Sequence, residues 1–154
     1  MFRKNKIELV VVCDNIRSLY NVGSIFRTSD ALGIKKIWLC GITGTPEQKG
    51  LQKVSLGAEN SVAWQYQKDA WRTAEKLKKQ GFQIVALELT EESIDVKVFK
   101  PKRKVALIVG NEVSGVSESL LKRADAIVRI PMKGIKESLN VSVAFGIAAY
   151  EIMS

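Results

Sequence analysis

The sequence contains no histidine, and only two of its 154 residues are cysteines. Histidine is the usual general base near neutral pH and the commonest metal ligand, so its absence excludes a Ser–His–Asp hydrolase. No cluster of cysteines and carboxylates takes its place, and we expect no bound metal. Cys13 and Cys40 each lie near the end of an apolar segment, which predicts buried, reduced thiols and no disulfide framework.

Long apolar segments are also missing from this chain. No stretch approaches the ~18 apolar residues that cross a membrane, and no cleavable signal is visible. We therefore expect a cytoplasmic protein without a membrane partner. With 46% hydrophobic residues, the chain can bury a core as one domain over residues 1–154, and no repeat or low-complexity linker divides it.

Acidic residues are few relative to basic ones. The chain has 24 Lys and Arg against 16 Asp and Glu, a formal net charge of +8. Such an excess favours a polyanionic partner, although many soluble proteins are basic and charge alone does not identify nucleic acid. The densest basic cluster is KPKRK at residues 100–104, which is either a solvated turn or a nucleic-acid contact.

Short apolar runs alternate with helical patterns along the chain, which predicts an α/β fold with a mainly parallel sheet flanked by helices. Most of the runs are continuous, as in strands covered on both faces. The expected strands are 7–13, 36–40, 83–89, 104–110 and 126–130, with a further one at 61–67. The expected helices include residues 22–32, 69–81 and 117–124. The Gly-rich, polar region 41–60 is expected to form a surface loop.

The last segment, KESLNVSVAFGIAAYEIM at residues 136–153, is apolar nearly all the way round from Val141 onward. This pattern predicts a helix buried on more than one side, including Ala148. Asn140 can cap such a helix by accepting hydrogen bonds from its first turn. A cap does not account for the preceding Ser138 and Leu139.

Three polar or Gly-rich segments follow expected strands, at residues 14–24, 110–116 and 131–140. In open α/β sheets, ligands bind beyond the carboxyl ends of the strands. The segment GNEVSGVS at 110–117 has the glycine spacing of a phosphate loop, but Val116 stands where that loop needs lysine. Gly110 either admits a ligand close to the backbone or serves the geometry of a turn.

Asn21 and Arg27 are the candidate side chains of the first segment. Asn21 is expected near the start of a helix, where its purely structural role would be that of an N-cap. Arg27 is expected near the border of the apolar face, about 120° around the helix from Asn21. A partly desolvated guanidinium there requires an anion, either a phosphate or Asp30 at i+3.

Together, three segments resemble the motifs of the SpoU–TrmH class of the SPOUT superfamily, the knotted RNA ribose 2′-O-methyltransferases. They are VVCDNIRSLYNVGSIFRTSDALG, LIVGNEVSGVSESLL and VRIPMKGIKESLNVSVAFGIAAYE. The resemblance implies a C-terminal deep trefoil knot, with the SLN turn against the cofactor. It also implies a homodimer through the C-terminal helix and the knot region, and the reaction expected is methylation of a ribose 2′-OH.

The resemblance also assigns site residues and a cofactor. The implied catalytic group is Arg27, Asn21, Glu112, Ser138 and Asn140. The implied cofactor is S-adenosylmethionine, with S-adenosylhomocysteine as product and largely main-chain contacts. The implied cofactor-binding residues are Leu87, Gly110, Ile130 and Leu139. Arg27 is either a general base or a clamp on a neighbouring phosphate that stabilises the developing alkoxide; since a guanidinium ordinarily keeps its proton in proteins, the clamp is a serious alternative.

The expected substrate is RNA, with tRNA favoured and ribosomal RNA open. No separate RNA-binding domain is expected, so a basic surface would hold the RNA. Candidates are Arg17, Lys49, Lys53, Lys133 and residues 100–104. Two other functions compete: a catalytically inactive RNA-binding protein of the same fold, and a nucleotide-dependent regulator built around residues 110–115. Saturable binding of S-adenosylmethionine separates the methyltransferase from the regulator.

Overall fold

The computed structural model of the chain describes residues 6–154 as a parallel sheet with helices on both faces. The strand order is β3-β2-β1-β6-β4-β7-β5, and each of the six strand pairings is parallel. The strands are β1 Glu8–Asp14, β2 Lys36–Cys40, β3 Trp64–Gln67, β4 Gln83–Leu87, β5 Ile94–Asp95, β6 Lys104–Val109 and β7 Ala126–Arg129. The helices are α1 Leu19–Leu32, α2 Lys49–Ser55, the 3₁₀ helix η1 Ala58–Asn60, α3 Ala70–Lys79, α4 Glu118–Arg123 and α5 Val141–Met153.

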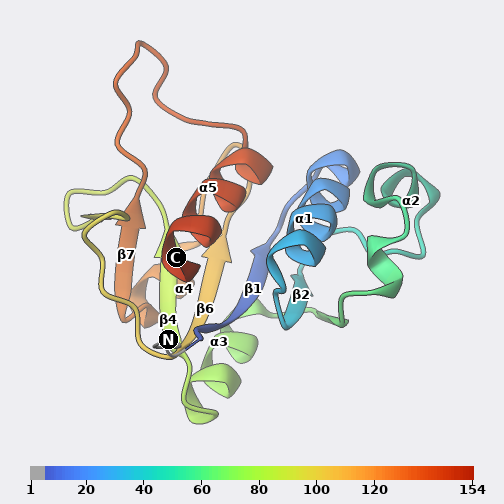
Figure 1. Cartoon of the computed structure of the whole chain (residues 1–154), viewed down its shortest axis with the longest axis horizontal. Helices are drawn as coiled ribbons and strands as arrows, with labels where there is room; N and C mark the ends of the chain where they lie inside the picture. Colours follow the sequence, from blue (N-terminus) through green and yellow to red (C-terminus); the bar gives the residue numbers. More distant parts are fainter. Residues whose placement is uncertain (1–5) are drawn as a thin grey trace, which may run out of the picture.

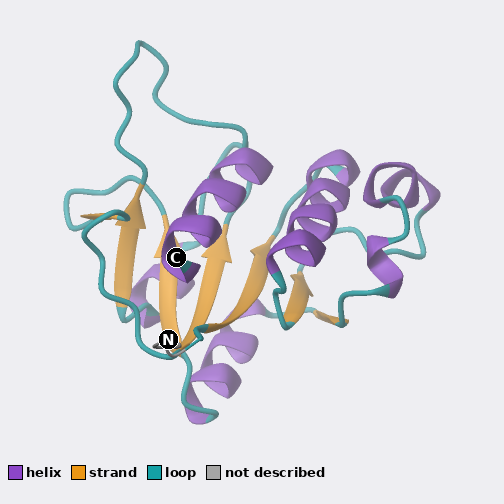
Figure 2. Ribbon diagram, in the orientation of Figure 1, coloured by secondary structure: helices purple, strands orange, loops and turns teal. Residues whose placement is uncertain are grey.

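The sheet is the middle of three layers (Figures 1 and 2). Helices α1, α2 and α5 cover one face, and α3 and α4 cover the other. Strand β1 shows why its sequence is a continuous apolar run: Leu9, Val11 and Cys13 belong to the core under α1 and α5, while Val10 and Val12 belong to the core under α3. The predicted α/β fold with a mainly parallel sheet is confirmed.

The strand register brings the three polar segments to one edge of the sheet. Cys13 pairs with Val109, so the chain leaves β1 and β6 side by side. Leu87 pairs with Val128, which sets the ends of β4 and β7 at the same edge. The segment after β7 then rises above this edge before returning to α5 (Figure 1). The trefoil knot stays a prediction.

The expected surface loop at 41–60 is wrong in part, because this region contains α2 and η1. Leu51 and Ser55 of α2 are buried, and α2 packs closely on α1 at Gly23. A Cβ at Gly23 would lie 2.7 Å from Val54 Cβ and 2.9 Å from the carbonyl oxygen of Leu51. This small residue therefore lets a short helix dock whose own sequence shows no strong apolar pattern.

The N-termini of α1, α3 and α4 differ in how they are capped. Helix α1 begins after Ser18, whose Oγ accepts a hydrogen bond from the N–H of Asn21 at 3.2 Å. Asn21 therefore lies inside the first turn and is not the cap. Asp69 and Ser117 stand at the N-cap positions of α3 and α4, but neither side chain makes a capping hydrogen bond.

Both cysteines are free and buried, as predicted. Burial raises the pKa of the Cys13 thiol far above its ordinary range. Burial also raises the pKa of Cys40 to about 11, against the opposing effect of its contact with Thr73. Separately, among residues 6–154 no helix is long and apolar enough to cross a membrane.

Within one chain, helix α5 is buried on one side only, and its predicted burial on a second side stays a prediction because it requires a partner subunit. Asn140 caps it as predicted, accepting hydrogen bonds from the N–H groups of Ser142 and Val143. Ala148 is fully buried in the core, whereas Val143, Ile147 and Tyr150 are 50%, 44% and 65% exposed. The apolar residues that the chain leaves uncovered form one face of the helix, and Ala148 is not on that face.

Candidate active site

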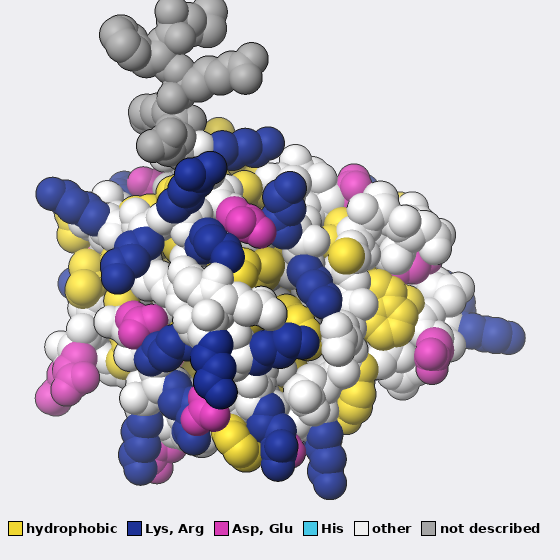
Figure 3. All heavy atoms as spheres, turned by 90° about the horizontal axis from the view of Figure 1, so that it is seen from below, with side chains coloured by type: hydrophobic (Ala, Val, Ile, Leu, Met, Phe, Trp, Pro, Cys, Tyr) yellow, Lys and Arg dark blue, Asp and Glu magenta, His cyan; other side chains and the backbone are white. Residues whose placement is uncertain are grey.

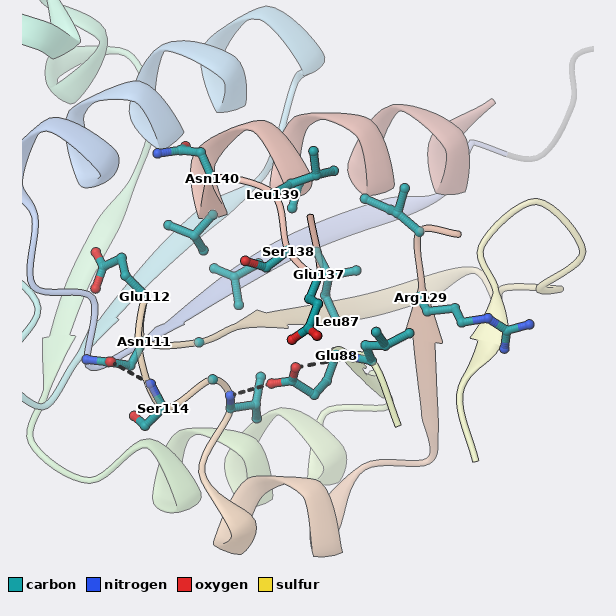
Figure 4. Close-up of a pocket in the computed structure, with 18 of the residues that line it drawn as sticks. Leu87, Glu88, Asn111, Glu112, Ser114, Arg129, Glu137, Ser138, Leu139 and Asn140 are labelled. Atoms are coloured by element: carbon teal, nitrogen blue, oxygen red, sulfur yellow. Dashed lines mark hydrogen bonds between the residues drawn. The ribbon is translucent and has the colours of Figure 1, made fainter. Parts of the chain in front are cut away.

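A pocket of about 650 Å³ opens at the carboxyl ends of β4, β6 and β7 (Figure 4). The segment 131–140 and the start of α5 form its other side. It is lined by the four predicted cofactor-binding residues Leu87, Gly110, Ile130 and Leu139, and by the predicted catalytic residues Glu112, Ser138 and Asn140. The strand-end rule and the resemblance thus agree on one place in the fold.

The loop 110–116 is tightly folded and held by its own side chains. Asn111 and Gly115 exchange two backbone hydrogen bonds of 3.0 and 2.9 Å. Asn111 Oδ1 accepts from the N–H groups of Val113 at 2.8 Å and Ser114 at 3.0 Å. A Cβ at Gly110 would lie 2.3 Å from the backbone of Gly115, so glycine is required here by the turn itself.

Few amides in this loop remain to bind a phosphate. Besides the bonds just described, the N–H of Val116 donates to Glu88 Oε2 at 2.9 Å and that of Ser117 to Asp14 Oδ2 at 2.8 Å. A phosphate loop works by pointing unpaired N–H groups at the anion. The glycine spacing therefore reflects a turn, which removes the support for a nucleotide-dependent regulator.

Glu88 is a site residue that the sequence reasoning missed. Its carboxylate accepts hydrogen bonds from the N–H groups of Val116 at 2.9 Å and Leu89 at 3.2 Å. Gly115 makes room for it, because a Cβ there would lie 2.2 Å from Glu88 Oε2. Its position directly after β4, next to the predicted Leu87, is the signal that could have found it.

Acidic side chains dominate the charge of the pocket. Glu88, Glu112 and Glu137 line it, and Figure 4 shows Glu137 extending into the pocket from the segment that closes it. Arg129 also lines the pocket, but its guanidinium is directed away and donates to the carbonyl oxygen of Ser93. The pocket therefore favours a cationic ligand over an anionic one.

Glu112 connects the second motif to the first. Its carboxylate accepts hydrogen bonds of 3.1 Å from the N–H of Arg17, the N–H of Ser18 and the Nδ2 of Asn21. Partial burial alone would raise the pKa of Glu112. These three hydrogen bonds and one from its own N–H together lower the pKa by more than burial raises it, so the pKa lies below its ordinary value. The side chain is therefore an ionised acceptor at neutral pH, rather than a proton donor.

Asn21 connects Glu112 to the third motif. Asn21 is only 5% exposed, and its Oδ1 accepts a hydrogen bond of 3.0 Å from Nδ2 of Asn140. Asn140 Oδ1 in turn accepts from the N–H and the hydroxyl of Ser142 at 3.0 and 2.6 Å. Glu112 can only accept at one end of this chain of hydrogen bonds, and the Ser142 groups donate at the other end. The amides of Asn21 and Asn140 can therefore each satisfy their partners in only one orientation. We call Glu112, Asn21 and Asn140 the amide relay.

Arg27 does not join this arrangement. Its side chain is exposed, and the expected position at the border of the apolar face is wrong. Six helical residues separate it from Asn21, about 9 Å along the axis at ~1.5 Å per residue. Within the described part of the chain no ion pair involves Arg27, and Asp30 instead accepts a hydrogen bond of 2.6 Å from Ser61 Oγ.

The chain is similar to known RNA methyltransferases over nearly its whole length. The SpoU rRNA Methylase family model matches residues 8–150. A tRNA (guanosine(18)-2'-O)-methyltransferase of Aquifex aeolicus is 35% identical, over 98% of this chain and 71% of that protein. The protein of the same name from Thermus thermophilus is 31% identical, over 98% and 77% respectively.

Solved structures agree with this result. The AdoMet-bound rRNA methyltransferase from Sinorhizobium meliloti has a TM-score of 0.85 and 30% identity, over 96% of this chain and 56% of that chain. The chain therefore spans little more than half of this relative.

The contribution of Glu112 to stability should depend on pH. Glu112→Gln is expected to lower the free energy of unfolding by about 1 kcal/mol at pH 7, because one amide oxygen must replace two carboxylate oxygens as acceptor. Since the pKa of Glu112 is lowered on folding, the wild-type advantage is present above its ordinary value of 4.5 and is lost as the pH falls below it. Urea unfolding at about pH 7 and pH 3.5 measures both values.

The exposed Glu91→Gln is the matched control and should show no such difference at either pH. An equal loss of stability in Glu112→Gln at both pH values would contradict an ionised, hydrogen-bonded Glu112.

Proposed function

This chain belongs to the SpoU rRNA methylase family, and from this membership we propose that it methylates a ribose 2′-OH of RNA with S-adenosylmethionine as methyl donor. The observation that supports the reaction most is the amide relay beside the acidic pocket, because it joins all three motifs at one edge of the sheet. The names of the relatives from A. aeolicus and T. thermophilus point to the same reaction.

S-adenosylmethionine suits the pocket in both its charge and its apolar lining. Its sulfonium and ammonium groups are cations, which the carboxylates of Glu88 and Glu137 favour. Leu87, Ile130 and Leu139 offer apolar surface to an adenine ring. When bound, the cofactor supplies an activated methyl group and leaves as S-adenosylhomocysteine. This transfer needs no metal. The cofactor bound to the S. meliloti relative supports the assignment.

The chain's own residues orient the reacting groups. The amide relay fixes the start of α5 against the first motif, so the turn containing Ser138 is held beside the pocket. Ser138 is exposed there, and we assign its hydroxyl a hydrogen bond to the ribose. Asn140 acts as a positioning residue, since both ends of its amide are already engaged. Such alignment of the reacting groups is a main source of rate enhancement in group transfer from an activated donor.

The proposed molecule is a homodimer that pairs through α5 and the neighbouring segment 131–140. The uncovered face of α5 carries Val143, Ile147 and Tyr150, and Leu139 adds to it with 38% exposure. Continuous exposed apolar surface of this kind is typical of a protein–protein interface. Arg27 on the adjacent helix α1 is then available to an RNA phosphate or to the partner's pocket, rather than to Glu112 of its own chain.

We favour tRNA as the substrate, with ribosomal RNA as the alternative. The A. aeolicus and T. thermophilus relatives act on tRNA by name, whereas the S. meliloti relative is named for rRNA. Both are folded RNAs that a protein can hold through shape and phosphates.

Methyl transfer itself is the first test. Labelled S-adenosylmethionine is incubated with the protein and either unmodified total tRNA or ribosomal RNA, and the RNA is then digested to nucleosides. Label on a 2′-O-methyl nucleoside from tRNA is the expected result. Label from ribosomal RNA alone would show that ribosomal RNA, rather than tRNA, is the substrate. Label on a base would contradict the proposed reaction. Saturable cofactor binding without any transfer would favour the inactive RNA-binding protein.

Arg27→Lys should separate the two roles of the guanidinium. Lysine keeps the charge but loses the planar fork that matches a phosphate. We expect turnover to fall by roughly 100-fold, the scale of a lost transition-state contact, while binding of S-adenosylmethionine is unchanged because Arg27 is not among the residues that line the pocket of its own chain. Single-turnover methyl transfer and equilibrium dialysis measure the two quantities. Near wild-type turnover would eliminate the clamp.

Ile147→Asp should dissociate the dimer without unfolding the chain, because the side chain is 44% exposed within one chain. Sedimentation equilibrium measures the mass, and circular dichroism confirms folding. Val98→Asp is the control, since Val98 is 67% exposed in a loop far from α5 in sequence. A folded Ile147→Asp dimer would show that another surface pairs. Ala148→Asp is unsuitable because it places a charge in the core.

A further inference from the structure

A second cavity, of about 580 Å³, lies at the opposite edge of the sheet from the active-site pocket. It is bordered by the starts of β1, β2 and β6 and by the end of α3. Four lysines line it, namely Lys35, Lys36, Lys76 and Lys104, and Glu8 is the one acidic residue among its lining side chains. The strands run away from this cavity and toward the pocket described above (Figure 1).

Aromatic rings and neutral oxygens, rather than carboxylates, contact three of these lysines. Lys36 and Lys76 lie 4.2 and 5.0 Å from the centre of the Trp38 ring, and Lys104 lies 4.4 Å from that of Phe82. Lys36 donates to Gln65 Oε1 at 2.9 Å. Among residues 6–154, each ion pair that does form involves other side chains.

The cavity thus gathers positive charge that the chain does not neutralise. Burial and, after it, the neighbouring charge of Lys76 lower the pKa of Lys36, so Lys36 and Lys76 repel one another across the cavity. The four lysines that line the cavity, none of them in an ion pair among residues 6–154, favour an oxygen-bearing anion that accepts hydrogen bonds from ammonium groups.

The basic surface continues beyond the cavity, and it therefore matches an extended ligand better than a small anion. Figure 3 shows this face of the molecule, where Lys and Arg side chains gather. The last turn of α3 adds the exposed Lys79, and the exposed Lys102 and Arg103 precede β6; the neighbouring Lys78 is instead paired with Asp125 at 3.3 Å. A row of cations of this extent matches the repeating phosphates of a nucleic acid.

We propose that this cavity and its basic surroundings dock the phosphate backbone of the RNA substrate at a second place, remote from the reacting ribose. The proposal rests on the proposed function, because it takes RNA to be the substrate. The seven residues of β1 separate the two edges of the sheet by about 20 Å at ~3.3 Å per residue. The docked phosphates therefore belong to a different part of the folded RNA, and the site should govern affinity rather than turnover.

The test compares two double variants with equal loss of charge. Lys35→Gln/Lys76→Gln removes two cavity cations, and Lys68→Gln/Lys97→Gln removes two exposed cations outside the cavity. Binding of unmodified tRNA is measured by fluorescence anisotropy between about 0.05 and 0.3 M salt. The cavity variant should bind about 30-fold more weakly near 0.1 M, with a log–log salt slope smaller by about 1.5 to 2, as for two lost phosphate contacts. The control variant should keep the wild-type slope.

Two further readings make the result decisive. Cofactor binding should be equal in all three proteins, and for methyl transfer KM for RNA should rise while kcat holds. Equal slopes in the two variants would overturn the proposal. Binding of inorganic phosphate to the cavity is monitored by Trp fluorescence. If phosphate saturates the cavity while the salt slope for RNA is the same in the cavity variant and the wild type, the cavity binds a small anion and the proposal is overturned. If the wild type transfers no methyl group to RNA, the proposed function fails, while the salt slopes still report on this site.

Discussion

The side chain of Asn21 holds the candidate site together, because the nitrogen and the oxygen of its amide join segments that are far apart in the chain. It donates to Glu112, 91 residues away, and accepts from Asn140, 119 residues away. A nearly buried amide is costly unless both groups find partners, so the three motifs stabilise one another through this residue. This pairing anchors the start of α5, and with it one wall of the pocket, while the rest of the helix is held by its buried side chains in the core.

Much of the fold could be predicted because the sheet is buried on both faces. The strands of a covered parallel sheet must be apolar throughout, and the observed β1, β2 and β6 lie within or close to the expected runs. The place of Gly110 in the pocket was predictable because ligands bind where parallel strands end, whereas Leu87 was predicted only from the resemblance to a family. Their assignment to a particular cofactor depended on the resemblance to a family, since main-chain contacts leave little trace in residue identity.

The features that could not be predicted depend on tertiary contacts. Helix α2 forms where Gly23 lets it approach α1, and a glycine within another helix gives no sign of this. The outward direction of Arg27 depends on where α1 starts and which faces its neighbours cover, which the spacing from Asn21 did not reveal. The lysines of the second cavity lie far apart in sequence, so only the fold brings them together. As a result, the molecule has an acidic pocket at one edge of its sheet and a basic cavity at the other.

The tight loop 110–116 has a consequence for the energetics of ligand binding. Its amides bond to Asn111 and Glu88 of the same chain, so its conformation is fixed during folding. A ligand that contacts this loop need not order it, and little conformational entropy is lost there on association. Glycine-containing loops are often flexible, but here amide hydrogen exchange would be slow before any ligand arrives, and binding would change it little.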